Sequence, residues 1–142
     1  MKALASLIRL HRFHLEEKRR TLAGFEGLMA DLVRRLAQLE DEVGREQRQA
    51  ANSSIGNFIY GAYARNVILR RETLKKSMAA LQIEIDGARQ AVAEAFQEVK
   101  RYEIAKERMD ERERDEAARR EQIAQDDLSI EMFRRREAAA TL

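Results

Sequence analysis

The chain contains 142 residues, with no Pro, no Cys and no Trp, and 37% of its residues are charged. The absence of Cys excludes a disulfide-stapled domain, a thiolate metal site and a thiol nucleophile, and the absence of Pro removes the commonest breaks between short elements. The 27 basic and 25 acidic residues leave a net charge of only +2, so charge alone gives little reason to expect nucleic-acid binding.

The composition predicts long helices from the first residues onward. Ala, Glu, Arg, Leu and Gln are abundant, which is typical of long helices and coiled coils. The chain has no run of 18 apolar residues, and Arg9 interrupts the apolar start too early for the core of a signal peptide. We therefore expect a protein of the cytoplasm.

The first predicted element is a helix over about residues 2–51. Apolar residues recur there at alternating steps of three and four, which is the seven-residue repeat of a coiled-coil seam. The same frame places His11 and Lys18 on the seam. The apolar members of the seam are Leu4, Ile8, Leu15, Leu22, Phe25, Met29, Leu32, Leu36, Leu39 and Val43.

A turn is predicted at about residues 52–57, because five of the six residues in Asn52-Ser53-Ser54-Ile55-Gly56-Asn57 favour turns or helix caps. A second helix with the same repeat is predicted over about residues 58–137. A connection this short makes the helices antiparallel neighbours, so the predicted fold is all-α, an antiparallel coiled-coil hairpin that forms one domain over residues 1–142. The seam of the second helix contains Tyr60, Val67, Leu74, Met78, Leu81, Ile85, Ala88, Val92, Ala95, Val99 and Tyr102.

The second helix is expected to continue past the point where the first runs out. If the turn centres near residue 54 or 55, residue i faces about residue 108 − i or 109 − i. From Lys106 to Glu121, 13 of 16 residues are charged, so the seam turns polar where the partner helix runs out. We therefore expect a tail that overhangs from about residue 106, and a thin hairpin without a concave pocket of ligand size.

Two sets of residues could in principle bind a metal ion or catalyse a reaction, but their patterns do not predict either kind of site. His11 and His14 are three residues apart, but no third ligand cluster accompanies them. Carboxylates such as Asp110 and Glu113 lie among arginines on a helix expected to be exposed, whereas general acid–base catalysis needs a pair held in a dry, shaped site. We expect a protein that is not an enzyme and that has no catalytic residues, no cofactor and no metal ion.

Basic clusters are the first candidate partner-binding feature. One surrounds Arg9 and Arg12, and the other surrounds Arg70 and Arg71. Each is compatible with a solvated helix face, with a surface for an acidic protein partner, or with nucleic acid. Neither has the interleaved stacking aromatics or the groove-reading motif that would favour nucleic acid.

Aromatic residues are the second candidate feature. Phe58, Tyr60 and Tyr63 follow the predicted turn, where they either close the apolar tip of the hairpin or bind a partner. Phe133, which precedes Arg134-Arg135-Arg136, has nothing on the overhanging tail to pack against. That position favours contact with another protein.

Several stretches of the chain recur in one known family in the same order. They include Leu7-Ile8-Arg9-Leu10, the repeat from Leu22 to Val43, the polar turn near residue 55, the stretch from Ala88 to Glu103, and the close with Glu121-Gln122, Asp126-Asp127 and Phe133-Arg134-Arg135. Together they resemble the family of the flagellar export protein FliJ over nearly the whole chain. The family often has Asp-Glu where this chain has Asp126-Asp127, which is a conservative departure.

The resemblance implies a hairpin similar to the rotor stalk of rotary ATPases, with three kinds of partner. These are the hexameric flagellar export ATPase, whose assembly and activity such proteins promote, the cytoplasmic domain of the export gate, and the export chaperones. It implies membrane association through partners only, and no nucleic acid. By analogy with a rotary stalk, the expected ATPase side contains Arg9, Arg12, Phe133, Arg134 and Arg135, and the expected gate contact contains Phe58, Tyr60, Tyr63, Val67, Arg70 and Arg71.

Two alternatives stay open from the sequence. One is the stalk of a virulence-type secretion system, which has the same shape and mechanism. The other is a generic coiled-coil scaffold or nucleic-acid-binding adaptor, which predicts binding to DNA or RNA with a steep dependence on salt.

Overall fold

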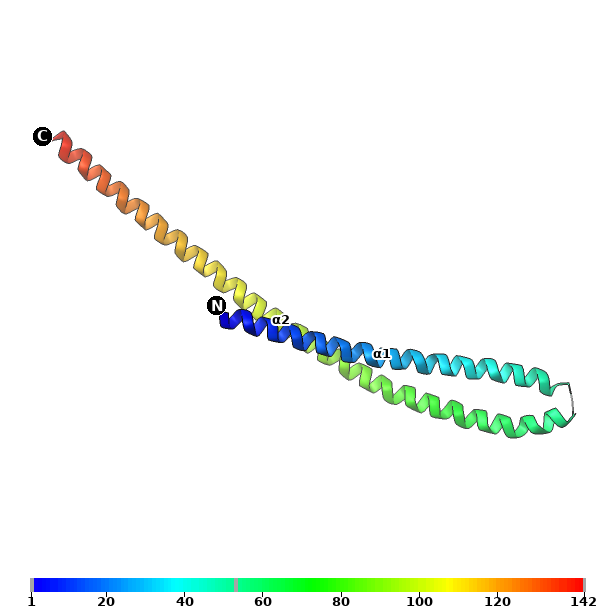
Figure 1. The fold of residues 1–142 in the computed structure, drawn as a ribbon. Helices are drawn as coiled ribbons and strands as arrows, with labels where there is room; N and C mark the ends of the chain where they lie inside the picture. Colours follow the sequence, from blue (N-terminus) through cyan, green and yellow to red (C-terminus); the bar gives the residue numbers. More distant parts are fainter. Residues whose placement is uncertain (1, 53, 142) are drawn as a thin grey trace. The chain divides into compact units, whose positions relative to one another are not determined.

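The structure, a computed structural model that describes residues 2–52 and 54–141, consists of two α-helices (Figure 1). Helix α1 spans Lys2–Ala50 and helix α2 spans Ser54–Ala140. The predicted all-α fold with a longer second helix is confirmed. The chain divides into two compact units: the hairpin unit, His11–Gln97, and the tail unit, Met1–Leu10 with Glu98–Leu142.

The connection between the helices is shorter than the sequence predicts. The Ala51 N–H donates to the Gln47 carbonyl (3.1 Å) and the Asn52 N–H to the Gln49 carbonyl (3.2 Å), so the end of α1 tightens to a three-residue spacing. The prediction of a turn at 52–57 was wrong for Ser54–Asn57, which are helical. A loop of two to five residues suffices between antiparallel helices, and Gly56 inside a helix costs only about 1 kcal/mol, so these turn-forming residues join α2.

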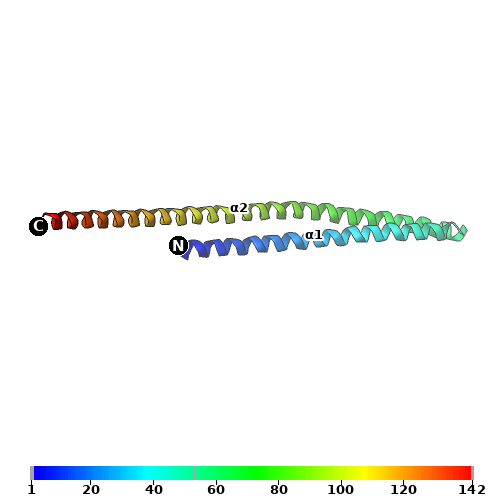
Figure 2. The same ribbon diagram turned by 90° about the horizontal axis from the view of Figure 1, so that it is seen from above.

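Within the hairpin unit, α1 and α2 run side by side in opposite directions (Figures 1 and 2). Two ion pairs cross between them, Arg71 with Glu40 and Arg70 with Glu42, so a forward step on α1 corresponds to a backward step on α2. The residue numbers of these pairs add to 111 and 112, against the predicted 108 or 109. Each side chain leans toward the N-terminus of its own helix. In an antiparallel pair, two side chains whose tips meet therefore start from residues that are not directly opposite each other, which raises the sum of their residue numbers.

The predicted seam is confirmed in the hairpin unit. Leu15, Leu39, Val67 and Ile85 are buried. The remaining apolar seam residues of this unit are half-buried, as a core between only two helices must be. They are Leu22, Phe25, Met29, Leu32, Leu36, Val43, Tyr60, Leu74, Met78, Leu81, Ala88, Val92 and Ala95.

The two polar residues on the α1 seam behave differently from each other. His11 is half-buried, and its ring meets the ring of His14 edge-on at a centroid distance of 6.0 Å. Lys18 is exposed, because its long stem carries the ammonium group out to water. Among residues 2–52 and 54–141, no group of three His, Asp or Glu residues lies close enough to hold a metal ion.

The tail unit has a short seam of its own. Ile8 and Val99 are buried there, and Leu4, Tyr102 and Met109 are half-buried. Burial ends at Asp110, and residues 111–141 are all exposed, whereas the sequence predicts an overhang from about residue 106. Lys106 is half-buried, and its ammonium group binds the Asp110 carboxylate at 3.1 Å, one turn along the same helix.

Neither helix, over its described residues, contains an apolar stretch of the length needed to cross a membrane.

Candidate interaction surfaces

The most exposed apolar residues of the hairpin unit lie at the start of α2. Phe58 is 86% exposed, and Ile55 is 73% exposed. Positions 55, 58, 59, 62 and 69 fall within an arc of about 100° on an α-helix, and none of them is a seam position. We call this surface, formed by Ile55, Phe58, Ile59, Ala62 and Leu69, the outer face of α2.

Tyr60 and Tyr63 lie on the seam side of the same helix. Both are half-buried, and their ring centroids are 6.0 Å apart with an angle of 45° between the planes. The Tyr63 hydroxyl is buried and has no hydrogen-bond partner among the described residues. Burial raises the pKa of Tyr63, and the negative charges of Glu42 and Glu46 raise it further. These tyrosines therefore close the tip of the hairpin rather than project from it.

Arg70 and Arg71 are held by α1. Arg71 donates to both carboxylate oxygens of Glu40, with Nε at 2.6 Å and a terminal nitrogen at 2.9 Å, and Arg70 donates to Glu42 at 3.2 Å. The hydrogen bond and charge of Arg71 lower the pKa of Glu40, and the same bond raises the pKa of Arg71. The sequence pattern alone did not predict these acidic partners. Their positions beside the α1 seam are the signal that could have found them, since flanking charges pair across coiled coils.

Val67 is a seam residue and is only 4% exposed. It stabilises the hairpin from within, so it has no surface to offer a partner. Of the six residues predicted for the gate contact, Phe58 alone is strongly exposed and without a charge partner.

An open groove runs between the helices of the hairpin unit, with a volume of about 890 Å³. The groove is open to solvent, so it does not contradict the prediction that the hairpin has no concave pocket of ligand size. Polar side chains flank Leu39 and Leu74 here. The groove is lined by Arg35, Gln38, Leu39, Glu42, Arg45, Glu46, Gln49, Leu69, Arg70, Thr73 and Leu74.

A second, smaller hollow lies next to the connection. Its volume is about 350 Å³. We call it the tip cavity, and it is lined by Glu46, Gln49, Ala50, Gly56, Ile59, Tyr60 and Tyr63.

The other predicted contact residues lie on exposed helix surface. In the tail unit, Arg9 and Arg134 are exposed, Phe133 is 61% exposed, and Arg135 pairs with Glu131 at 3.5 Å. In the hairpin unit, Arg12 is exposed and Phe13 beside it is 56% exposed.

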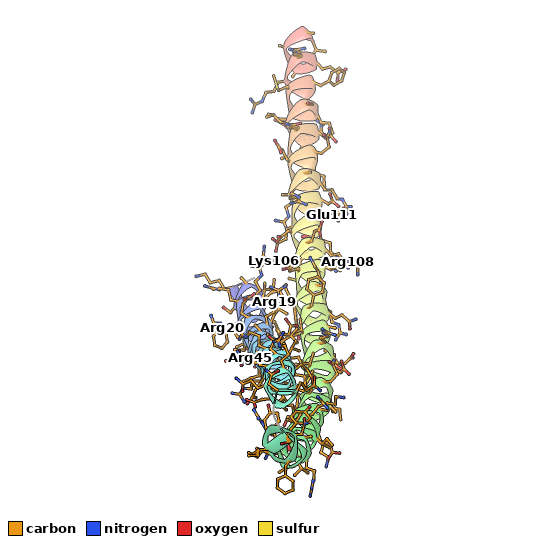
Figure 3. The ribbon with its side chains drawn as sticks, turned by 90° about the vertical axis from the view of Figure 1, so that its right-hand side faces the viewer. Arg19, Arg20, Arg45, Lys106, Arg108 and Glu111 are labelled. Carbon is orange, nitrogen blue, oxygen red and sulfur yellow. The ribbon has the colours of Figure 1, made fainter. Side chains whose placement is uncertain are left out.

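The tail presents charge and scattered apolar side chains on all sides. Figure 3 shows Arg108 and Glu111 projecting from the side of α2 opposite Lys106. No described residue of α2 beyond Asp110 is covered. Exposed large apolar residues follow at Ile123, Leu128, Ile130, Met132 and Phe133.

Comparison with known proteins finds one family for this chain. Neither the curated proteins nor the solved structures contain a significant match. The family model described as "Flagellar FliJ protein" matches residues 1–138, which is nearly the full length. The chain therefore belongs to the flagellar FliJ family.

Proposed function

We propose that this chain is the stalk of the flagellar type III export apparatus, and that it binds the export ATPase ring, promotes the assembly and activity of that ring, and links it to the export gate and the chaperones. The family match over residues 1–138 is the observation that carries this proposal, because the family is a non-catalytic component of the flagellar export apparatus. A match to a flagellar family favours this apparatus over a virulence-type system. We propose that the chain acts as a single hairpin domain in the cytoplasm.

The exposed tail supports a contact with the ATPase. A helix without a partner is held only by weak pairs within itself, such as Arg120 with Glu116 at 3.6 Å. Burial of Ile123, Ile130 and Phe133 against another protein would stabilise it by far more. We therefore assign the ATPase contact to the tail, with Arg134 and Arg135 beside Phe133.

The outer face of α2 supports a contact with the gate. Phe58 is the predicted gate residue with the largest exposed apolar area, and Ile55, Ile59 and Leu69 extend its surface. Arg70 and Arg71 support that face from behind through their ion pairs with α1. The same ion pairs weaken the nucleic-acid alternative, since two guanidinium groups of the second basic cluster are already neutralised.

Mixing the purified chain with the cognate export ATPase tests the main proposal. We expect more ring assembly by sedimentation and faster ATP turnover at saturating chain. Phe133→Ala should weaken both effects, whereas Phe58→Ala, which removes an exposed ring from the hairpin unit, should leave them unchanged. No change in assembly or turnover with the unmodified chain would refute the stalk proposal.

Binding to the purified cytoplasmic domain of the gate tests the second contact. We expect Phe58→Ala to weaken binding by about tenfold or more, as the loss of a central aromatic anchor does. Ile83→Ala, another strongly exposed apolar residue of α2, is the matched control and should bind normally. Equal loss in both variants would argue against the outer face as the specific contact.

A further inference from the structure

The residues that line the tip cavity suit a long, positively charged side chain. Tyr60 and Tyr63 supply two aromatic rings 6.0 Å apart, and Ile59 adds an apolar edge. Aromatic faces attract cations, most strongly when water is partly excluded. The volume of about 350 Å³ is at the small end of ligand sites, so it suits a single long side chain better than a cofactor.

The charge of the cavity is not balanced within the hairpin unit. Two other carboxylates of α1 are neutralised, Glu40 by Arg71 and Glu42 by Arg70. Glu46, the charged residue that lines the cavity, makes no ion pair with any described residue. Its negative charge reaches the cavity wall, since it helps to raise the pKa of Tyr63.

We propose that the tip cavity binds the side chain of an arginine from a partner protein, with the guanidinium group on Glu46 and against the rings of Tyr60 and Tyr63. A planar guanidinium can stack on a ring and donate to a carboxylate at the same time, which an ammonium group does less well. The negative charge of Glu46 thus favours a positively charged arginine as the side chain that fills the cavity.

The surroundings indicate that this arginine belongs to an amphipathic segment. Ile55 is 73% exposed, one turn before the cavity residue Ile59 on α2. An apolar side chain near the arginine would cover Ile55 and exclude water around the charged pair, as around other interface hot spots. The inference goes beyond the stalk proposal and does not depend on which export component supplies the segment.

The first test uses Nα-acetylarginine amide as the probe and the full chain as the receptor. Titration should shift the ring resonances of Tyr60 and Tyr63 in a saturable way. Nα-acetylcitrulline amide, which has the same shape without the charge, should bind about fivefold more weakly or worse. Equal binding of the two probes, or no saturable shift at either ring, would overturn the proposal.

Variants of the chain locate the site. Glu46→Gln should weaken the arginine probe by about fivefold while helicity stays unchanged, because Glu46 makes no ion pair within the described chain. Glu84→Gln, which removes an exposed carboxylate from α2 of the same unit, should bind the probe normally. Normal binding by Glu46→Gln would contradict the assignment.

A peptide separates a protein partner from a free small cation. We expect a helical peptide with one arginine, flanked by leucines three and four residues away, to bind at least about tenfold more tightly than the single amino acid. Ile55→Ala should remove most of this advantage without changing affinity for the amino acid. A peptide that binds no more tightly than the amino acid would refute an amphipathic protein segment as the occupant.

Discussion

Two leucines of the hairpin unit have the same side chain in opposite surroundings. Leu39 is 3% exposed in the seam, whereas Leu69 is 63% exposed on the outer face of α2. Loss of buried methyl groups costs transfer free energy and leaves a cavity, so Leu39→Ala should lower the free energy of unfolding by about 2–3 kcal/mol. Leu69→Ala should change it by less than about 0.5 kcal/mol. Urea denaturation of both variants checks the contrast, and similar losses would contradict the seam.

The ion pair between Glu40 and Arg71 makes part of the stability depend on pH. Because Arg71 lowers the pKa of Glu40, the folded state binds this proton less readily than the unfolded state. The contribution is complete above the ordinary carboxyl pKa of about 4.5 and is lost as the pH falls through the lower, folded value. Glu40→Gln should therefore destabilise the chain at pH 7 and become less destabilising below pH 4.5.

Urea denaturation at pH 7 and at pH 3 measures this difference. Glu84→Gln removes the same charge without breaking an ion pair of the described chain, so it serves as the control. Added salt should shrink the effect of Glu40→Gln at pH 7, since both partners are exposed. An effect of Glu40→Gln that is the same at both pH values would show that the pair adds no stability.

For individual residues, the sequence predicted which apolar side chains are buried but not which charged side chains form ion pairs. Every apolar residue that the seven-residue frame placed on the seam of the hairpin unit is buried or half-buried, because water excludes apolar side chains wherever the partner helix lies. The prediction did not include Ala50, which is also buried. The ion pair of Arg71 with Glu40 depends on the relative shift of two helices and on where long side chains lean. Those quantities depend on packing between elements far apart in the chain, which periodicity does not specify.

The helices carry glycines that no turn or close approach requires. Gly27 and Gly87 are exposed helix-interior residues without positive φ angles, and a Cβ atom built on either would meet nothing within 4 Å. Alanine at these positions reduces the freedom of the unfolded chain, so each substitution should add up to about 1 kcal/mol to stability.

Thermal unfolding of Gly27→Ala, Gly87→Ala and the double variant measures the gain. The positions are far apart, so the two effects should add. Ala93→Gly, a reverse change at an exposed position of α2, should lower the unfolding midpoint by a similar amount. A midpoint that falls in the Gly→Ala variants would mean that a glycine has a structural role in its helix.

The boundaries of the elements show which local signals outweigh others. Asn52 predicted the chain reversal correctly, but Gly56 and Asn57 did not extend it. A residue that favours turns also tolerates a helix when helical hydrogen bonds are available on both sides. The end of α1 was predicted to within one residue, because the residues that favour turns begin at Asn52.

For the molecule as a whole, the continuous seven-residue apolar repeat predicted the two-helix fold. The replacement of apolar by charged seam residues in the second half of α2 predicted that the end of α2 has no partner helix. It did not predict the groove or the tip cavity, since a hollow forms where side chains of two elements fail to meet. The contact residues of the tail and of the outer face of α2 remain predictions, because a surface bound by another protein is tested only with that protein.

Shortening the chain separates the roles of its two seams. Deletion of residues 111–142 removes only exposed helix among the described residues, so the unfolding midpoint of the remainder should stay unchanged. The deletion should also abolish stimulation of the export ATPase, because it removes Phe133 and its neighbours. Deletion from residue 98 is the control. It also removes Val99 and Tyr102, which would expose Ile8 and release the first residues of α1.

Circular dichroism, thermal unfolding and ATP turnover measure these outcomes together. Deletion from residue 98 should lower the helical signal by more than the deleted residues contribute, because the first residues of α1 also lose their helix. Deletion of 111–142 should lower it only by the contribution of the deleted residues. A lower unfolding midpoint after the shorter deletion would mean that the tail stabilises the rest of the chain. Undiminished stimulation of the ATPase by that variant would refute the tail as the ATPase contact and leave the hairpin unit as the part that binds the ring.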